Sequence, residues 1–317
     1  MANIIHRTFD DPRDYERRIR LAKVSDLVVS EPGTFSASLT IVNVGRVWLQ
    51  GGCESLARTM RIAIEDSRRS LMFLADKEAA SIIQSGAEFG ADDVVSFGQN
   101  TSHFQRTFGP IRWVAMALFP GDLDAAVSTI AGRELGEPTT TLCMKPPAAR
   151  LDRLRQLYRE VNRMAFSGEK VLDHPEVRRS LEQTLTVAMV SCLAAEAGRT
   201  HSPGWHRHQQ VMQRFREWLD ANNDRAVYLQ EVCAALEVSA PTLRRCCEEH
   251  LGMSPMQYLG QRRMNLARQE LQRRDSQTSV TATAMNFGFW HLGRFADEYR
   301  SLFGESPSLT LARRSSR

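Results

Sequence analysis

The chain has 317 residues, of which 42% are hydrophobic and 25% charged, and its formal net charge is +4. This length accommodates two domains with separate cores, and the composition is that of a globular protein rather than a disordered chain. The sequence contains no run of about 18 apolar residues and its start does not resemble a signal peptide, so we expect a cytoplasmic protein without membrane contact.

Residues 1–147 are predicted to form a β-rich domain. Between residues 35 and 120, short runs of β-branched and aromatic residues alternate with Gly, Asp and Pro, which is typical of a sandwich or barrel. The predicted strands cover 39–44, 60–64, 71–74, 94–97 and 111–116. Residues 138–147 are predicted to be a connection.

Aromatic side chains of this region are candidates for an effector pocket, namely Trp48, Phe73, His103, Phe104 and Trp113. Core packing is the competing interpretation, because an aromatic residue in a strand more often belongs to the core. The six cysteines form no C-x-x-C pair, and His103 has no partners at metal-binding spacing. We therefore expect no metal and no cofactor.

Residues 148–204 are predicted to form a helical connector. Apolar residues recur at helical spacing over 148–165 and 175–198. We expect these two helices to join the domains or to form a homodimer. The stretch Arg-Thr-His-Ser-Pro-Gly at 199–204 is interpreted as the linker to the last domain.

The net positive charge lies in residues 205–317. They contain 16 arginines, no lysine and 12 acidic residues, whereas residues 1–204 contain 25 basic and 25 acidic residues. Arginine forms bidentate contacts with phosphate and with guanine. The distribution indicates a polyanionic partner, and a solvated charged surface is the alternative.

Two helix-turn-helix units are predicted in tandem after a helix over 208–222. In the first, a helix at 229–236 precedes a turn in which Ser239 is placed to cap the next helix, with Pro241 in its first turn. In the second, a helix at 280–285 precedes a turn that needs Gly288 and a helix at 290–302. The second helix of such a unit enters the major groove.

A helix predicted over 255–274 separates the two units. At 1.5 Å per residue it would span about 30 Å, close to the roughly 34 Å between successive major-groove faces. A single chain could then read an asymmetric site with both units. Arg262, Arg263 and Arg268 on this helix could bind phosphate or pair with acids such as Glu270, and both interpretations stay open.

Residues with a characteristic order and spacing occur in both units. In the first they are Val238-Ser239, Leu243-Arg244-Arg245, Leu251-Gly252-Met253-Ser254-Pro255, Tyr258, Arg262-Arg263, Ala267 and Leu271. In the second they are Ala284, Phe287-Gly288-Phe289, Phe295, Tyr299-Arg300, Phe303-Gly304 and Ser306-Pro307. Over about 100 residues this pattern resembles the DNA-binding module of the AraC/XylS (arabinose-regulator) family. Within it, residues 288–296 and 306–311 look most like the ethanolamine-utilisation regulators.

The resemblance implies a sequence-specific transcription regulator, with activation expected. The implied fold is a multidomain α+β protein in which an N-terminal β-rich, cupin-like domain and connecting helices precede a C-terminal all-α double helix-turn-helix domain over 205–317. The implied partners are double-stranded DNA, RNA polymerase, a small-molecule effector and a second copy of the chain.

Carried over position by position, the resemblance assigns DNA contacts to Pro241, Thr242, Arg244 and Arg245 in the first unit and to Leu292, Gly293, Arg294 and Asp297 in the second. His291 is a further candidate, for a phosphate contact, from its residue type and position. Arg244 is the expected bidentate contact to guanine. Asp297 would repel phosphate unless it is paired, so we expect specificity to depend more on the first unit. Trp290 is expected to pack at the domain surface.

Two other classes of function compete with this interpretation. An enzyme is not expected, because the sequence has no G-x-S-x-G, phosphate-binding glycine loop, H-E-x-x-H or nucleotide-binding fingerprint. An effector-independent regulator, whose N-terminal region only dimerises or binds a partner protein, remains open beside the effector-controlled one.

Overall fold

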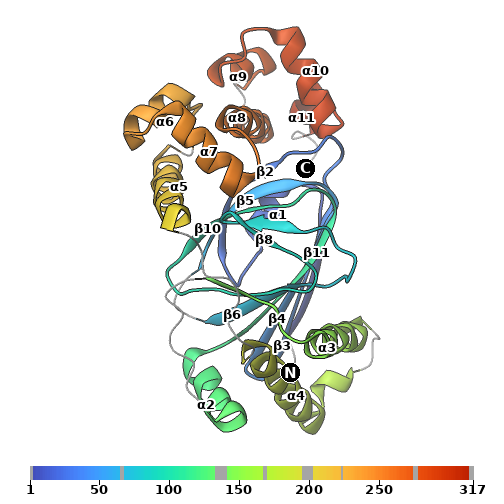
Figure 1. The fold of residues 1–317 in the computed structure, drawn as a ribbon. Coiled ribbons are helices and arrows are strands. Elements are labelled where there is room, and N and C mark those ends of the chain that lie inside the picture. The colour runs from blue at the N-terminus through green and yellow to red at the C-terminus, as the bar shows by residue number, and fades with distance from the viewer. Residues whose placement is uncertain are drawn as a thin grey trace.

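Strands dominate the first 144 residues and helices the remainder of the chain (Figure 1). The computed structural model describes residues 3–64, 68–132, 141–166, 170–194, 203–222, 224–273 and 278–313. The strands are β1 (Asn3–Phe9), β2 (Lys23–Val29), β3 (Ala37–Val44), β4 (Val47–Glu54), β5 (Arg58–Ala63), β6 (Arg69–Leu74), β7 (Ile82–Gln84), β8 (Ala87–Phe89), β9 (Val94–Ser96), β10 (Ser102–Arg106), β11 (Ile111–Leu118) and β12 (Leu142–Met144). The helices are α1 (Pro12–Glu16), α2 (Pro120–Ala131), α3 (Ala148–Phe166), the 3-10 helix η1 (Lys170–Asp173), α4 (Pro175–Leu193), α5 (Pro203–Ala221), α6 (Leu229–Leu236), α7 (Ala240–Leu251), α8 (Pro255–Gln272), α9 (Val280–Asn286), α10 (Leu292–Phe303) and α11 (Pro307–Arg313).

The described strands form two antiparallel sheets that share a core and are together called the barrel. One has the order β1-β3-β4-β11-β6-β9-β12 and the other the order β2-β5-β10-β7-β8. Alternation along the strands sorts side chains between two cores, because successive residues point to opposite faces. On β11, Val114 and Met116 pack against α2, α3 and α4, whereas Trp113 and Ala115 face the second sheet. The central strands of the first sheet are thus buried on both faces, whereas its edge strand β1 is exposed.

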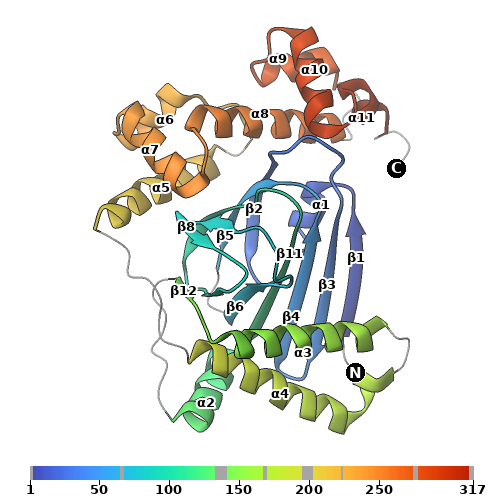
Figure 2. The same cartoon turned by 45° about the vertical axis from the view of Figure 1, so that its right-hand side comes forward.

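The helices after residue 203 form two further cores. One joins α5, α6, α7 and the start of α8, and the other joins the second half of α8 with α9 and α10. Figure 2 shows α8 lying across the barrel end, with the first group of helices on one side and the second on the other. The helices α3 and α4 lie at the opposite end of the barrel (Figure 2).

The helices α5, α7 and α8 dock on the outer face of the five-stranded sheet. Phe104 of β10 is fully buried, with its ring centroid 6.0 Å from Phe215 of α5 and 5.8 Å from Tyr258 of α8. Asn265 of α8 hydrogen-bonds both the backbone N–H and the carbonyl of Val29, each at 3.3 Å. A side-chain amide therefore continues the hydrogen bonding of β2.

A β-bulge supplies the charged part of this interface. The pairing of β2 with β5 shifts register after Ser25, and Asp26 adopts a left-handed backbone with φ of 56°. Bulges re-aim side chains, and here the Asp26 carboxylate lies 2.9 Å from Arg262 Nε and 3.5 Å from Arg61 Nε. Both arginines are buried. The bulge thus ties the spacer helix to the barrel.

The predicted fold class is confirmed: a β-rich N-terminal region is followed by an all-α helix-turn-helix region. Some boundaries differ. The predicted connection over 138–147 contains β12, and its residues 138–140 lie outside the described part of the chain. The predicted linker over 199–204 is described only at its last two residues, which begin α5. Helices α1, α2 and α11 were not predicted from the sequence.

Candidate nucleic-acid interface

The first helix-turn-helix unit is formed by α6 and α7. Its turn reverses at Glu237, which has a left-handed φ of 53°. As predicted, Ser239 caps α7: its hydroxyl accepts a hydrogen bond from the Thr242 N–H at 3.3 Å, and Pro241 lies in the first turn, where a missing N–H has no cost. Leu243, Cys247 and Leu251 then point into the core.

The second unit is formed by α9 and α10. Ser279 caps α9 through the Ala282 N–H, at 3.1 Å. Gly288 in the turn has a φ of 77°, and a Cβ there would overlap the hydroxyl of Tyr228. The glycine requirement seen in the sequence therefore has two causes, the left-handed backbone and the approach of a side chain from the first unit.

The two units are internal repeats at the level of the backbone. Leu243 and Phe295 fill the cores at equivalent positions, and Gly252 and Gly304 end α7 and α10 with φ values of 63° and 70°. A Ser-Pro pair begins the following helix in both units. The repeat therefore places the N-terminal turn of α10 in the same relation to its unit as that of α7.

The N-terminal turns of α7 and α10 are exposed to solvent. Every residue for which the sequence predicts a DNA contact is classed as exposed: Pro241, Thr242, Arg244, Arg245, His291, Leu292, Gly293, Arg294 and Asp297. Successive residues of a helix are rotated by about 100°, so the neighbours of a core residue point away from the core. The geometry leaves these side chains free to meet a duplex.

Each recognition helix carries one arginine paired with a glutamate one turn later. Arg244 Nε lies 2.8 Å from Glu248 Oε1, and Arg294 Nε lies 2.7 Å from Glu298 Oε1. The Glu248 carboxylate raises the pKa of Arg244. Exposed pairs of this spacing contribute little to stability, because water and salt screen their attraction. A phosphate or a guanine edge can therefore replace either glutamate at little cost.

The spacer helix and one stacked arginine connect the two units. With 18 residues, α8 is about 27 Å long at 1.5 Å per residue. Arg263 on this helix lies between the units, with its guanidinium 5.2 Å from the Tyr228 ring and 5.5 Å from the Phe289 ring. Cation–π contacts of this kind resist rotation of one unit against the other.

Two spacer arginines left open by the sequence have partners inside the protein. Arg262 binds Asp26 and donates to the carbonyl oxygens of Asn222 at 3.0 Å and Arg225 at 3.3 Å. Arg268 lies 3.3 Å from Glu305. These pairings favour the intramolecular interpretation over phosphate contact for both residues.

Trp290, just before α10, differs from the expectation of surface packing. Its side chain is 78% exposed and contacts His291 with ring centroids 3.7 Å apart. A large exposed aromatic group beside a recognition helix is a candidate contact to sugar or base. Its position in the sequence, between the glycine turn and α10, is the feature that could have indicated this role.

The five predicted pocket residues do not share one site. Phe73 is buried under α3 and α4, Trp113 lies between the sheets, and Phe104 belongs to the first helix-turn-helix core. Trp48 is half-buried on β4 beneath Arg68, whose guanidinium is 3.8 Å from its ring. These residues lie on different faces of the two sheets. Alternation along a single strand does not show which core each face meets.

His103 and Trp113 are held in polar networks within the barrel. The His103 ring nitrogens lie 3.1 Å from Ser85 Oγ and 2.7 Å from Thr141 Oγ1, and burial lowers its pKa to about 3. Trp113 donates from Nε1 to Glu54 at 2.8 Å. Glu54 also pairs with Arg58 at 2.7 Å, and both side chains are buried.

A small apolar cavity lies between the sheets. Its volume is about 40 Å³, room for a few water molecules, whereas metabolite pockets have about 300–1,000 Å³. Trp113 is the one predicted pocket residue in its lining, which also includes Met60, Phe97 and Gln105. In the described ranges, no cluster of three His, Cys, Asp or Glu residues is placed to hold a metal. The described helices include none long and apolar enough to cross a membrane.

Comparison with known proteins places the similarity in the C-terminal region. A helix-turn-helix domain family matches residues 232–313. Over 110 residues the chain is 36% identical to XylDLEGF operon transcriptional activator 2 of Pseudomonas putida, covering 34% of this chain and 70% of that protein. It is 31% identical over 142 residues to XylDLEGF operon transcriptional activator 3 of the same species, covering 44% of this chain and 42% of that protein. The second match spans less than half of that relative.

A solved structure aligns with most of the chain. The crystal structure of the AraC-like transcriptional activator CuxR covers 83% of this chain and 94% of its own, with 14% sequence identity and a TM-score of 0.42. The two relatives named above are transcriptional activators.

Proposed function

The chain belongs to the AraC/XylS family of DNA-binding transcription regulators, and we propose that it is an activator that reads two adjacent major-groove segments through α7 and α10. The observation that carries this proposal is the repeat of an exposed recognition turn on both sides of one continuous spacer helix. A spacer of about 27 Å, together with the helices at its ends, suits the roughly 34 Å between successive groove faces.

The proposed DNA contacts follow the exposed turns. Arg244 is assigned a guanine edge and Arg245 a phosphate, while Leu292 meets a thymine methyl and Arg294 a phosphate or guanine. Pro241, Thr242, His291, Gly293 and Asp297 complete the surface. The hydroxyl of Thr242 already lies 2.8 Å from Ser239 Oγ, so its contact is oriented before DNA arrives.

Selection of binding sites from random DNA with the purified full-length chain tests this function. We expect two boxes whose centres lie about one helical turn apart, each with its own base preferences. Affinity for the selected site should fall steeply with salt, because phosphate contacts release counterions. A single box, or binding without base preference, would contradict the proposal.

Trp290 extends the proposed second reader. Because its ring is exposed and contacts His291, we expect Trp290→Ala to weaken binding at the second box and to leave the melting temperature unchanged. Fluorescence anisotropy on the selected site measures the first effect and thermal unfolding the second. A large drop in melting temperature would assign Trp290 to packing instead.

Control by an effector is supported by two strands of the five-stranded sheet, β5 and β10, each of which contacts the cavity on one face and the C-terminal helices on the other. On β5, Met60 lines the cavity while Arg61 binds Asp220 of α5 at 2.7 Å. On β10, Gln105 lines the cavity while Phe104 packs in the first helix-turn-helix core. A ligand that shifted these strands would shift the DNA-binding helices.

The small volume of the cavity favours the second candidate, an effector-independent regulator. In that case the N-terminal region only dimerises or binds a partner protein. An apolar groove of about 430 Å³ between α3 and α4, where Val187 is 40% exposed, is a suitable surface for a homodimer. Val187→Glu should then yield a monomer in sedimentation, without loss of folding. An unchanged mass would exclude this surface.

Three further parts of the proposal rest on family membership. RNA polymerase is the proposed protein partner, because activators act on it, and the proposed location is the cytoplasm, where both DNA and polymerase are found. The resemblance of residues 288–296 and 306–311 to ethanolamine-utilisation regulators remains a prediction about target genes. Identification of the bound promoter tests it.

A further inference from the structure

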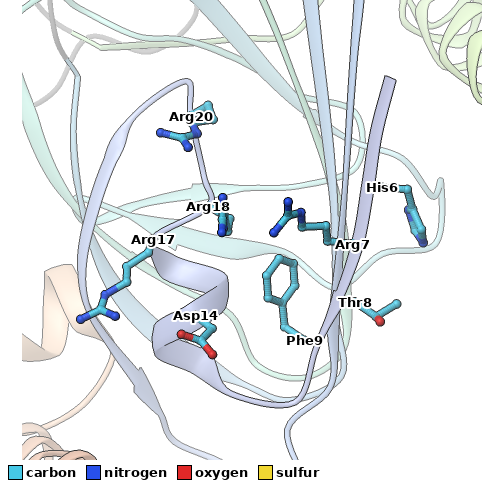
Figure 3. A pocket seen from close by; sticks show the side chains of 8 residues that line it. All are labelled: His6, Arg7, Thr8, Phe9, Asp14, Arg17, Arg18 and Arg20. Carbon is cyan, nitrogen blue, oxygen red and sulfur yellow. The ribbon is translucent and has the colours of Figure 1, made fainter. Parts of the chain in front are cut away.

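An open cleft rich in arginine lies on the outside of the N-terminal region (Figure 3). It has a volume of about 840 Å³ and is bounded by β1, α1 and the segment that follows α1. Its lining consists of His6, Arg7, Thr8, Phe9, Asp14, Arg17, Arg18 and Arg20. It shares none of these residues with the cavity between the sheets or with the recognition helices.

The side chains of β1 alternate between the cleft and the other side of the strand. His6 and Thr8 point away from the arginines (Figure 3), and His6 Nδ1 lies 3.0 Å from Thr40 Oγ1. Arg7 and Phe9 point into the cleft. The strand therefore contributes one cation and one flat apolar ring to the same space.

Three arginines, Arg7, Arg18 and Arg20, line this space. Figure 3 shows Arg18 between Arg7 and Arg20, while Arg17 and the carboxylate of Asp14 are directed away from Arg7. Asp14 is the acidic residue of the lining. Among the described residues, no ion pair involves Arg7, Arg18 or Arg20. The cleft thus holds positive charge that no ion pair among the described residues neutralises.

The segment that carries Arg18 and Arg20 is held by a buried side chain of β4. Gln50 of β4, which is 1% exposed, accepts hydrogen bonds from the backbone N–H groups of Arg20 at 3.1 Å and Leu21 at 3.2 Å. Ile19 and Leu21 line the cavity between the sheets, whereas Arg18 and Arg20 line the cleft. One segment therefore covers the apolar cavity with one face and presents cations on the other.

Guanidinium groups bind carboxylates and phosphates through paired hydrogen bonds. Three of them around one space require more than one negative charge for neutralisation, and repulsion among them is relieved when such a ligand binds. We propose that the cleft of Arg7, Arg18 and Arg20 is a binding site for a small polyanion that carries at least two carboxylate or phosphate groups. The ring of Phe9 contributes an apolar contact to the carbon skeleton.

This site deepens the proposed regulation by naming the chemical class of an effector. It rests on the proposed function only for its consequence on DNA binding, because occupancy of the cleft needs no DNA. A ligand joined to Arg18 and Arg20 would hold the segment that covers the cavity, and α1 beside it contacts the spacer helix through Asp11 and Gln272, at 2.6 Å.

Thermal unfolding of the full chain with citrate and with inorganic pyrophosphate, at constant ionic strength, tests the site. We expect a rise in melting temperature of about 3–6 °C at 10 mM probe, because a ligand bound only by the native state stabilises it. The double variant Arg18→Gln, Arg20→Gln and the single variant Arg7→Gln should lose most of the rise. Arg159→Gln, an exposed arginine on α3, should retain it, and acetate should produce less than about 1 °C.

Two results would overturn the proposal. One is an equal rise in the double variant and in the Arg159→Gln control. The other is a rise that disappears in Arg244→Gln, Arg245→Gln, which would place the anion on the first recognition helix. Since the readout contains no DNA, its failure leaves the proposed operator reading intact, and failure of operator selection leaves this site intact.

Discussion

The two helix-turn-helix units share one backbone plan and differ in how they are anchored. The core of the first unit includes Phe104 of the barrel, in ring contact with Phe215 and Tyr258. The buried core of the second unit contains residues from α8 to α10, and its contact with the barrel includes a backbone hydrogen bond from Gly33 to Leu302 at 3.1 Å. Duplication of a motif therefore does not duplicate its surroundings.

The units also differ in the chemistry of their exposed turns. The first presents Thr242, Arg244 and Arg245, whereas the second presents Leu292, Arg294 and Asp297 at its corresponding face. The first unit has two cations in this turn, whereas the second has one cation and one carboxylate. The first unit therefore attracts phosphate more strongly. The first unit is thus both the better anchored and the more basic, and we expect it to dominate affinity.

The largest expected effect is on anchoring. Phe295→Ala removes a side chain that is 1% exposed and should destabilise the second unit by about 3–5 kcal/mol. Because its core is separate, we expect α9 and α10 to lose protection in hydrogen exchange while the barrel and the first unit keep theirs.

The matched control is Phe215→Ala, in the core that includes Phe104. It should lower protection in α5, α7 and β10 together. The comparison fails if Phe295→Ala lowers protection of the whole chain to the same degree.

The second effect concerns the barrel side of the spacer helix. Burial, with Asp26 nearby, raises the pKa of Glu16 from 4.5 to about 7. Below pH 4.5, the carboxyl of Glu16 is protonated in both the folded and the unfolded chain. As pH rises from 4.5 to 7, the unfolded chain loses this proton before the folded chain does, so the free energy of unfolding falls over that range. Glu16→Gln should therefore stabilise the protein by up to about 3 kcal/mol at pH 8 and by almost nothing at pH 4.

Urea unfolding at the two pH values measures this difference. The amide oxygen of glutamine can still accept the Leu27 N–H, which Glu16 accepts at 2.8 Å. Glu78→Gln, at an exposed position, is the control and should show no difference between the two pH values. Equal behaviour of the two variants would contradict the raised pKa of Glu16.

The smallest effect addresses the acid in the second reader. Asp297→Asn removes an exposed negative charge from the proposed DNA face and should raise affinity for the selected site about 2–5-fold at low salt, with less effect at high salt. Anisotropy titrations measure it. Asp173→Asn, exposed in the N-terminal region, should change nothing. A loss of affinity in Asp297→Asn would show that this carboxylate accepts a hydrogen bond from a base.

Local signals predicted the helical part of the molecule well. The Ser239 cap, the Gly288 turn and the periodic core residues depend on neighbours within a few positions, and all are present in the structure. The roles of Arg262 and Phe104 could not be predicted, because their partners Asp26 and Phe215 are more than 100 positions away along the chain. The arginine cleft likewise depends on β1 lying beside the segment after α1.

The most direct test of paired reading is base-resolved affinity on the selected operator for Arg244→Ala, Arg294→Ala and the control Arg159→Ala. We predict that each recognition variant loses base preference in its own box only, with a cost of about 1–3 kcal/mol for Arg244→Ala and less for Arg294→Ala, and that the control matches the wild type. Loss of preference at the same base positions in both variants, or at none, would contradict the account of two independent readers on one spacer helix.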